Sequence, residues 1–447
     1  MRVIYFLFVV AGLISGCTSN EVRLAHSVDL VPATRSIPEE QLLDVGIAVF
    51  GSGVPEGEVD KEILEELIRD GTFIYIRRTE ARYMAVTLRD TLQKSGHWGA
   101  VWVTPSASTA ADVNVMAEIL RSDGDEFLLY VKAVDASGRV WLDGEYGMGT
   151  AAGAYNRQRF GGLDPYQDVF SSIANDLATV QGKLAVNEAE KIRSIAQLRF
   201  AGELSPEVFG EHVVQSNRGE YELRRLPAEG DPMFGRTQRI REREHLFVET
   251  LNQHYDQFYQ DSIESYDGWR QFSREEAIAI KELHRSTRWR TGLGIATVVA
   301  SVVYGSQSDG DGFSDRMVRD ALMYMGMDMI KTGAIRKQEK RLHEETLEEL
   351  SSSFDDEVRP MVVEIEGTQH RLTGTADVQY QEWRQLLKDL FVSETGLLPA
   401  DMSIYTEPPP SELELIAVPE TTSGSESVGQ NEDMNLEAVD TGVATDT

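Results

Sequence analysis

Two short motifs combine residue types that could bind a metal ion. His343-Glu344-Glu345-Thr346-Leu347 begins like the zinc-protease pattern, in which two histidines on one helix face hold the metal, but leucine replaces the second histidine. Asp309-Gly310-Asp311-Gly312 begins like a calcium loop. Aligning its last glycine with the invariant one places Gln307 and Val318 at two essential ligand positions. Neither ligand set is complete, so the sequence predicts no zinc or calcium site.

A run of alternating methionines offers thioether ligands of the kind that select Cu(I): Met323, Met325, Met327 and Met329. On a helix these four divide into two pairs that face different sides. Met325 and Met329 continue an apolar stripe, which is the spacing of core residues. Packing is the preferred interpretation, and no cofactor is predicted beyond covalent lipid.

Patterns for other chemistry are incomplete or missing in the sequence. It contains no Gly-x-Ser-x-Gly elbow, no Walker loop and no dinucleotide-binding glycine loop. Carboxylates for glycoside cleavage are defined by their separation in space, and 74 acidic residues offer no way to choose a pair. The net charge of −31 repels nucleic acid within about 8–10 Å. We therefore expect a protein that is not an enzyme and does not bind nucleic acid.

One six-residue pattern occurs twice, as Tyr266-x-x-Trp269-Arg270-Gln271 and as Tyr380-x-x-Trp383-Arg384-Gln385. On a helix, tyrosine and tryptophan at this spacing share a face, with the arginine beside them. These residue types dominate the hot spots of protein interfaces, so both clusters are candidate partner-binding sites. The same residues also fasten helices together inside a fold. Both interpretations stay open, with packing slightly favoured.

The N-terminus has the layout of a signal peptide, because Arg2 precedes an unbroken apolar run that ends in small residues. Ile14-Ser15-Gly16-Cys17 resembles the lipobox of bacterial lipoproteins. The resemblance implies that residues 1–16 are removed and that Cys17 carries lipid on its sulfur and an acyl chain such as palmitate on its new amine. An uncleaved anchor with a chance cysteine is the less favoured alternative. Thr18 replaces the family's usual inner-membrane signal, which implies the outer membrane, facing the periplasm.

Cys17 is also the only cysteine, so lipidation leaves no thiol for a disulfide, a zinc site or a nucleophile. Residues 17–40 are polar, contain Pro32 and Pro38 and show no periodicity, which predicts a lipidated flexible tether. A periplasmic protein without disulfides needs a hydrophobic core large enough to be stable without crosslinks, and the remaining chain is long enough to form one.

Residues 41–186 read as an α/β domain in the order strand, helix, a meander of three or four strands, helix. The expected strands are 45–50, 100–103, 113–120, 127–134 and 140–146, and the expected helices are 60–68, 79–92 and 164–184. This order, with Ala111-Asp112-Val113 before a strand and a hairpin within Asp135–Trp141, is similar to a periplasmic domain. That domain occurs in penicillin-binding-protein activator lipoproteins, the curli-export lipoprotein and the N-terminal part of TolB. The resemblance implies protein binding or ring assembly without chemistry.

Residues 187–350 are predicted to be mainly helical, with a long amphipathic helix over 237–259. Asp231-Pro232 is expected to break the chain, and Ser273–Glu276 has the pattern of a capping box. Within residues 351–406 we expect a hairpin at 361–373 and a helix at 376–391. Residues 407–447 carry ten acids and no Lys or Arg, which predicts a disordered tail. The fold class is therefore α+β.

The segment 292–304 is apolar and uncharged, which is unusual for the mature chain. It is too short to span a membrane as a helix, which takes about 20 residues, but long enough for a transmembrane strand of about ten. Its small residues would also suit an oligomer contact. Core packing is the preferred interpretation, and membrane insertion of residues 292–330 is kept as the alternative.

These features together predict a non-enzymatic outer-membrane lipoprotein that acts as a protein-binding adaptor or activator in the cell envelope. Its expected partners are the membrane, through the lipid anchor, and another envelope protein. The alternative is an oligomeric pore or export component that inserts residues 292–330. A homo-oligomer is left open by both.

Overall fold

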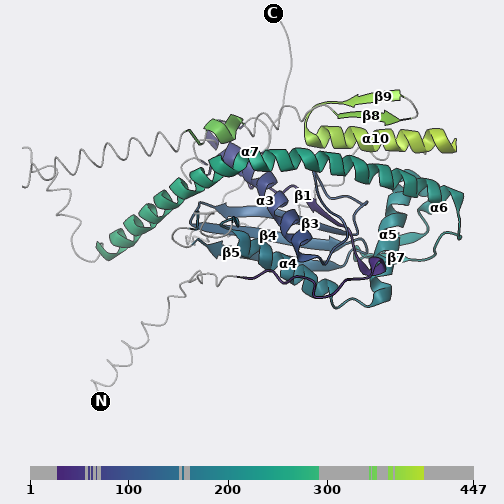
Figure 1. Cartoon of the computed structure of the whole chain (residues 1–447), viewed down its shortest axis with the longest axis horizontal. Helices are drawn as coiled ribbons and strands as arrows, with labels where there is room; N and C mark the ends of the chain where they lie inside the picture. The colour runs from purple at the N-terminus through teal and green to yellow at the C-terminus, as the bar shows by residue number, and fades with distance from the viewer. Residues whose placement is uncertain are drawn as a thin grey trace, which may run out of the picture. The chain divides into compact units, whose positions relative to one another are not determined.

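The computed structural model describes residues 28–55, 59–60, 62–63, 67, 72–150, 154–155, 162–290, 342–343, 345–349, 361–365 and 368–396. The chain divides into two units, residues 1–400 and 401–447, and every described residue belongs to the first. The first unit is α+β, as the sequence predicts: a mixed sheet is followed by a long helix and small hairpins (Figure 1).

A five-stranded sheet in the order β2-β1-β3-β4-β5 is the centre of this unit. The strands are β1 (Val45–Ala48), β2 (Val101–Thr104), β3 (Val113–Ser122), β4 (Glu126–Asp135) and β5 (Val140–Gly149). β1 pairs in parallel with both β2 and β3, whereas β3, β4 and β5 form an antiparallel meander. Side chains of β4 alternate strictly between buried and half-buried, so one face of the sheet is core and the other is partly open.

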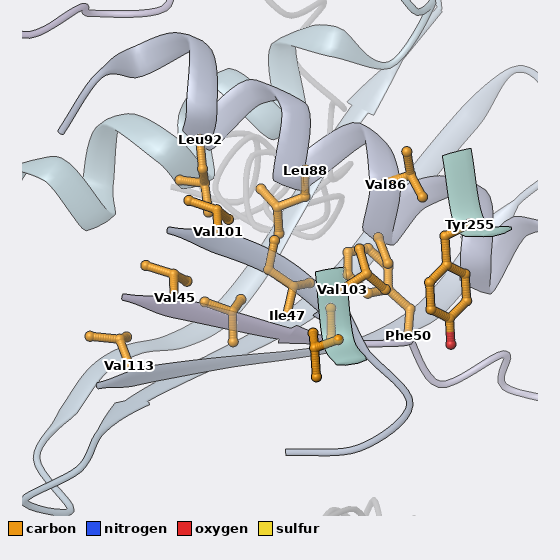
Figure 2. Packing of buried hydrophobic residues seen from close by; sticks show 14 of the residues in the cluster. Val45, Ile47, Phe50, Val86, Leu88, Leu92, Val101, Val103, Val113 and Tyr255 are labelled. Atoms are coloured by element: carbon orange, nitrogen blue, oxygen red, sulfur yellow. The ribbon is translucent and has the colours of Figure 1, made fainter. Parts of the chain in front are cut away.

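Two helices cover the core face of the sheet: α3 (Ile74–Ser95) and α4 (Gln167–Gln181). α3 ends at Gly96, whose φ of 69° is the left-handed conformation that favours glycine after a helix. Figure 2 shows Leu88 and Leu92 pointing from α3 towards Ile47 and Val101 of the sheet. Each such buried aliphatic side chain stabilises the fold by about 1.5–3 kcal/mol.

The chain then forms a set of helices and two hairpins. Their bounds are α5 (Val186–Leu204), α6 (Pro206–Phe209), β6 (Val213–Gln215), β7 (Tyr221–Leu223), α7 (Pro232–Arg290), β8 (Met361–Ile365), β9 (Thr368–Leu372) and α10 (Ala376–Thr395). The hairpin and helix expected within 361–391 are both present. α7, 59 residues long, packs against α3, α5, α10 and β2. One hydrophobic cluster joins these helices to the sheet, from Leu43 to Phe391.

Two expectations about α7 were wrong. Asp231-Pro232 starts this helix instead of breaking the chain, because the Asp231 carboxylate accepts hydrogen bonds from the backbone N–H of Met233 (2.8 Å) and Phe234 (3.1 Å). Proline is well tolerated at the first helical position, since its missing N–H has no partner there. The capping box at Ser273 starts no helix, because α7 continues through it with Ser273 buried.

The polar segment before the sheet is partly fastened to the domain, in contrast with the flexible tether expected over 17–40. The Asn175 side chain on α4 accepts from Val31 N (2.9 Å) and donates to Asp29 O (3.0 Å). Ala33 N donates to Ser95 O at the end of α3 (2.8 Å). A polar sequence without periodicity does not reveal that its backbone groups find partners on two helices.

Several expectations concern residues outside the described part of the chain. These are the signal peptide with Cys17, the segment 292–304, the four methionines, the calcium-like loop, most of the helix expected over 60–68 and the acidic tail 407–447. Among the residues that the structure does describe, no helix is both long and apolar enough to cross a membrane.

Candidate functional site

Arg270, one of the residues singled out by the sequence, is a fully buried charge. Its side chain on α7 is 0% exposed, and its Nη1 and Nη2 donate to Oδ1 (3.1 Å) and Oδ2 (3.0 Å) of Asp164. A further bond joins it to Asp267, one helical turn earlier. Burial by itself lowers the pKa of Arg270, but the two carboxylates outweigh it and the pKa is raised. The guanidinium is therefore a permanent, internally paired cation.

Four tyrosine rings surround this guanidinium. Its central carbon lies 4.0 Å from the ring centre of Tyr266, 4.9 Å from Tyr166, 5.6 Å from Tyr83 and 5.7 Å from Tyr155. Rings at these distances attract a cation through their negative faces. In other proteins such a cage binds a ligand cation, whereas here Arg270 of the same chain lies among the rings.

Glu80 on α3 is the second buried charge of this cluster, with 0% of its side chain exposed. Its Oε1 accepts from the hydroxyls of Tyr266 (2.7 Å) and Ser122 (2.5 Å), and its Oε2 lies 3.7 Å from Arg77. Burial raises the pKa of Glu80, and Arg77 with the two hydroxyls only partly offsets this. A carboxyl with a raised pKa suits a general acid. Since the Glu80 carboxyl is enclosed by this chain's own groups, the arrangement favours a structural role.

The second copy of the sequence pattern forms the same arrangement on α10. The Tyr380 hydroxyl donates to Glu244 Oε1 (2.8 Å), which also accepts from Ser108 Oγ (3.2 Å). The Trp383 ring stacks on Phe247 with centroids 5.0 Å apart. Arg384 forms an ion pair with Glu203 and lies 3.9 Å from Glu244. In both copies a tyrosine of a later helix binds a buried glutamate of an earlier helix, and a serine shares that glutamate.

The six candidate partner-binding residues are therefore mostly interior. The exposed fractions are 0% for Tyr266, 1% for Trp269, 0% for Arg270, 0% for Tyr380 and 5% for Trp383, and the Arg384 side chain is 20% exposed. A ring with no accessible surface has nothing to offer a partner, so packing replaces partner binding as the role of the aromatic residues. The sequence could not point to Glu80 and Glu244, because they lie 186 and 136 positions from their tyrosines.

A third polar cluster joins the residues just before the inner strands β1 and β3 to α7. Asp112 is fully buried and accepts from Asp44 N (2.9 Å), with Arg241 3.6 Å away. Burial raises the pKa of Asp112 to about 6, although Arg241 lowers it. Beside them the His245 ring lies against Trp102, with the ring centres 4.6 Å apart and the planes tilted by 40°, and burial lowers the pKa of His245 to about 4. Among the described residues no group of three or more His, Cys, Asp and Glu could hold a metal ion.

The remaining candidate is the face of the sheet opposite α3 and α4, which we call the open face. Its residues are Glu118 and Leu120 of β3, Leu128, Tyr130, Lys132 and Val134 of β4, and Asp143, Glu145 and Gly147 of β5. Cross-strand pairs place Tyr130 beside Glu118 and Glu145, and Lys132 beside Asp143. Leu120 is 39% exposed. No sequence pattern marked this surface, since alternation shows which residues share a face but not whether that face is covered.

Comparison with known proteins gives no further assignment: no protein-family model matches this chain, and no curated protein matches it significantly.

Proposed function

We propose that this protein is a non-enzymatic adaptor that is anchored in the outer membrane by lipid on Cys17, faces the periplasm and binds another envelope protein. The observation that carries the proposal is the open face. Half-buried Leu128, Tyr130 and Val134 lie among charged groups there. Apolar and aromatic side chains mixed with charges are the usual composition of a non-obligate protein interface.

The buried polar clusters support a platform role for the domain. Tyr266 and Arg270 fasten α7 to α3 and to Asp164, and Tyr380 fastens α10 to α7. Hydrogen bonds and ion pairs that are buried and fully partnered hold the helices rigidly in place, so the helices form a fixed backing for the sheet. A fixed backing lowers the ordering cost that the open face incurs when it binds a partner.

The fastened segment 29–33 supports a position close to the membrane. If Cys17 carries lipid, the chain from Cys17 to Asp29 spans at most about 40 Å when fully extended. Asp29, where the chain is fastened to the domain, would then remain within that distance of the bilayer surface. Its partner would be a membrane protein or a periplasmic protein that works at the membrane.

Crosslinking in living cells tests the proposal directly. A tagged wild-type protein should capture one heterologous envelope protein at a fixed ratio. The double variant Tyr130→Ala/Lys132→Glu alters the open face and should lose it. Glu249→Lys, an exposed change on α7, is the matched control and should retain it. Capture of self-crosslinked multimers alone would contradict the adaptor and favour the pore alternative, whose residues 292–330 lie outside the described part of the chain.

The anchor has its own test. Cys17→Ala should leave a folded protein, with unchanged circular dichroism and unfolding midpoint, that fractionates with soluble periplasmic proteins. The amount of partner that this variant captures should also be lower than the amount captured by wild type. Full capture by the soluble variant would show that the anchor is not part of the adaptor's action.

A further inference from the structure

The two edges of the sheet differ in how their backbone groups are satisfied. At the β2 edge, Asn252 of α7 binds both backbone groups of Val103: its Oδ1 accepts from N (2.8 Å) and its Nδ2 donates to O (2.8 Å). At the other edge, β4 is the only described strand that pairs with the ten-residue strand β5. Within the described part of the chain, a helix therefore covers one edge, and the other edge is a template for an added strand.

The register shows which β5 groups face away from the sheet. Thr150 N donates to Asp125 O (2.8 Å), and the ladder continues from Glu126–Gly149 to Lys132–Asp143. Hydrogen-bonded pairs alternate with non-bonded pairs in an antiparallel ladder. Leu142, Gly144, Tyr146 and Met148 therefore bond to β4. Asp143, Glu145 and Gly147 direct their N–H and C=O groups outward.

The residues with outward backbone groups also determine the charge of this edge. The side chains of Asp143 and Glu145 are exposed and lie on the open face. The whole chain is acidic as well, with a net charge of −31. An extended segment added here would place its own side chains opposite these two carboxylates, where opposite charges attract and like charges repel.

This charge pattern argues against a second copy of the chain as the occupant. If two β5 strands paired antiparallel along their whole length through their outward groups, Glu145 would lie opposite Glu145 or Asp143. Like charges directly opposite each other destabilise a strand pair. The same carboxylates would stabilise a strand with Lys or Arg at alternate positions.

We propose that the outer edge of β5 binds an extended, basic segment of a partner protein as a sixth strand of the sheet. Backbone hydrogen bonds to Asp143, Glu145 and Gly147 would hold the segment. Lys or Arg at every second position would face the carboxylates of Asp143 and Glu145. This inference rests on the proposed adaptor function, since it specifies where and how that partner binds.

The test uses the full chain in mild detergent and a fluorescent ten-residue peptide of alternating lysine and threonine. Its anisotropy should rise on titration, and an alternating glutamate and threonine peptide should not bind. Glu145→Pro removes one outward N–H and should weaken binding by about tenfold or more, because a carbonyl of the peptide loses its donor. Proline is tolerated at such a position because its missing N–H lies outside the β4 ladder.

Two further variants separate the backbone contribution from the charge. Glu145→Gln keeps the N–H and should weaken binding less than Glu145→Pro does. Glu249→Gln removes another exposed acid, on α7, and should leave binding unchanged. Hydrogen exchange followed by mass spectrometry should show that the peptide protects the segment 143–147, and that Glu145→Pro without peptide exchanges like wild type in β4.

Wild-type protein that fails to bind the lysine peptide, or binding that Glu145→Pro does not weaken, would overturn the inference. The adaptor proposal is decided separately by cellular crosslinking. A partner captured by wild type and equally by Glu145→Pro would leave the adaptor intact and reject the edge. No captured partner would reject the adaptor itself.

Discussion

The Tyr266 hydroxyl donates a 2.7 Å hydrogen bond to Oε1 of Glu80, which lies 186 positions earlier in the chain. Tyr380 and Glu244 repeat this relationship at 2.8 Å. Each bond joins a helix to an earlier helix: the first joins α7 to α3, and the second joins α10 to α7. A buried glutamate needs such donors, because a carboxyl group without hydrogen bonds in the interior is costly.

We expect Tyr266→Phe and Tyr380→Phe to destabilise the protein by about 1–3 kcal/mol each, because each leaves a buried carboxyl short of one donor. Urea unfolding measures the loss. Exposed Tyr75→Phe on α3 is the control and should change stability little. A neutral result for both buried variants would mean that the serine hydroxyls alone satisfy the glutamates.

Removing the central cation should have the largest effect. Arg270→Met leaves Asp164 and Asp267 without their buried partner, and we expect a loss of about 3–5 kcal/mol. Adding Asp164→Asn to Arg270→Met should recover part of this loss, because one uncompensated charge is gone. The double-mutant cycle is measured by chemical unfolding. If the two losses simply added, the pair would not be coupled.

The pKa of His245 predicts a specific acid sensitivity. Burial and Arg241 lower the pKa of His245 to about 4, and Asp44 opposes them only partly. Near pH 5 the folded state keeps this histidine neutral, while the unfolded chain binds the proton at about pH 6.5. Stability should therefore fall as the pH drops from 7 to 5, by about 2 kcal/mol from this group.

His245→Phe keeps an aromatic ring against Trp102 and should remove that dependence. The quantity to compare is the change in unfolding free energy between pH 7 and pH 5 in wild type and variant. Asp112 acts in the opposite direction, because its raised pKa of about 6 favours folding as the pH falls, but both proteins share it. Equal pH slopes in the two proteins would show that His245 takes up its proton in the folded state over the same pH range as in the unfolded chain.

Asn252 predicts what happens when the covered edge is opened. Asn252→Leu keeps the size of the side chain but leaves Val103 N and O without their partner. We expect a loss of about 1–3 kcal/mol. We also expect concentration-dependent association on mild heating, because an unpaired edge is a template for another strand. Light scattering should detect it, with exposed Thr250→Leu on the same helix as the control.

Local sequence patterns predicted much of the fold correctly. The α+β class, the five strands, the helix expected over 79–92 and the C-terminal hairpin with its helix all follow from period and turn signals. Both copies of the Tyr-Trp-Arg pattern lie on helices, α7 and α10, as their spacing indicates. Such signals can be recognised in a sequence because the residues that form them are close together in the chain and influence the conformation of their own segment.

The misread elements are those whose outcome depends on distant partners. The pattern at Ser273 begins a helix only if the chain before it is not helical, and the packing of α7 decides that. The segment 29–33 is polar, yet Asn175 and Ser95 supply partners for its backbone. Propensity is a weak prior that tertiary contacts override.

The sequence by itself therefore determined the five strands of the sheet, the helices that pack on it and the C-terminal hairpin with its helix, but not the full extent of α7 or the β6–β7 hairpin. Only the tertiary structure decided the order of the strands, the glutamates that Tyr266 and Tyr380 bind, and the difference between the covered edge at Asn252 and the open edge at Glu145. The physical reason is that the repeat of apolar side chains along a helix or strand specifies which of its faces is buried. The groups that pack against that face come from segments far away in the chain.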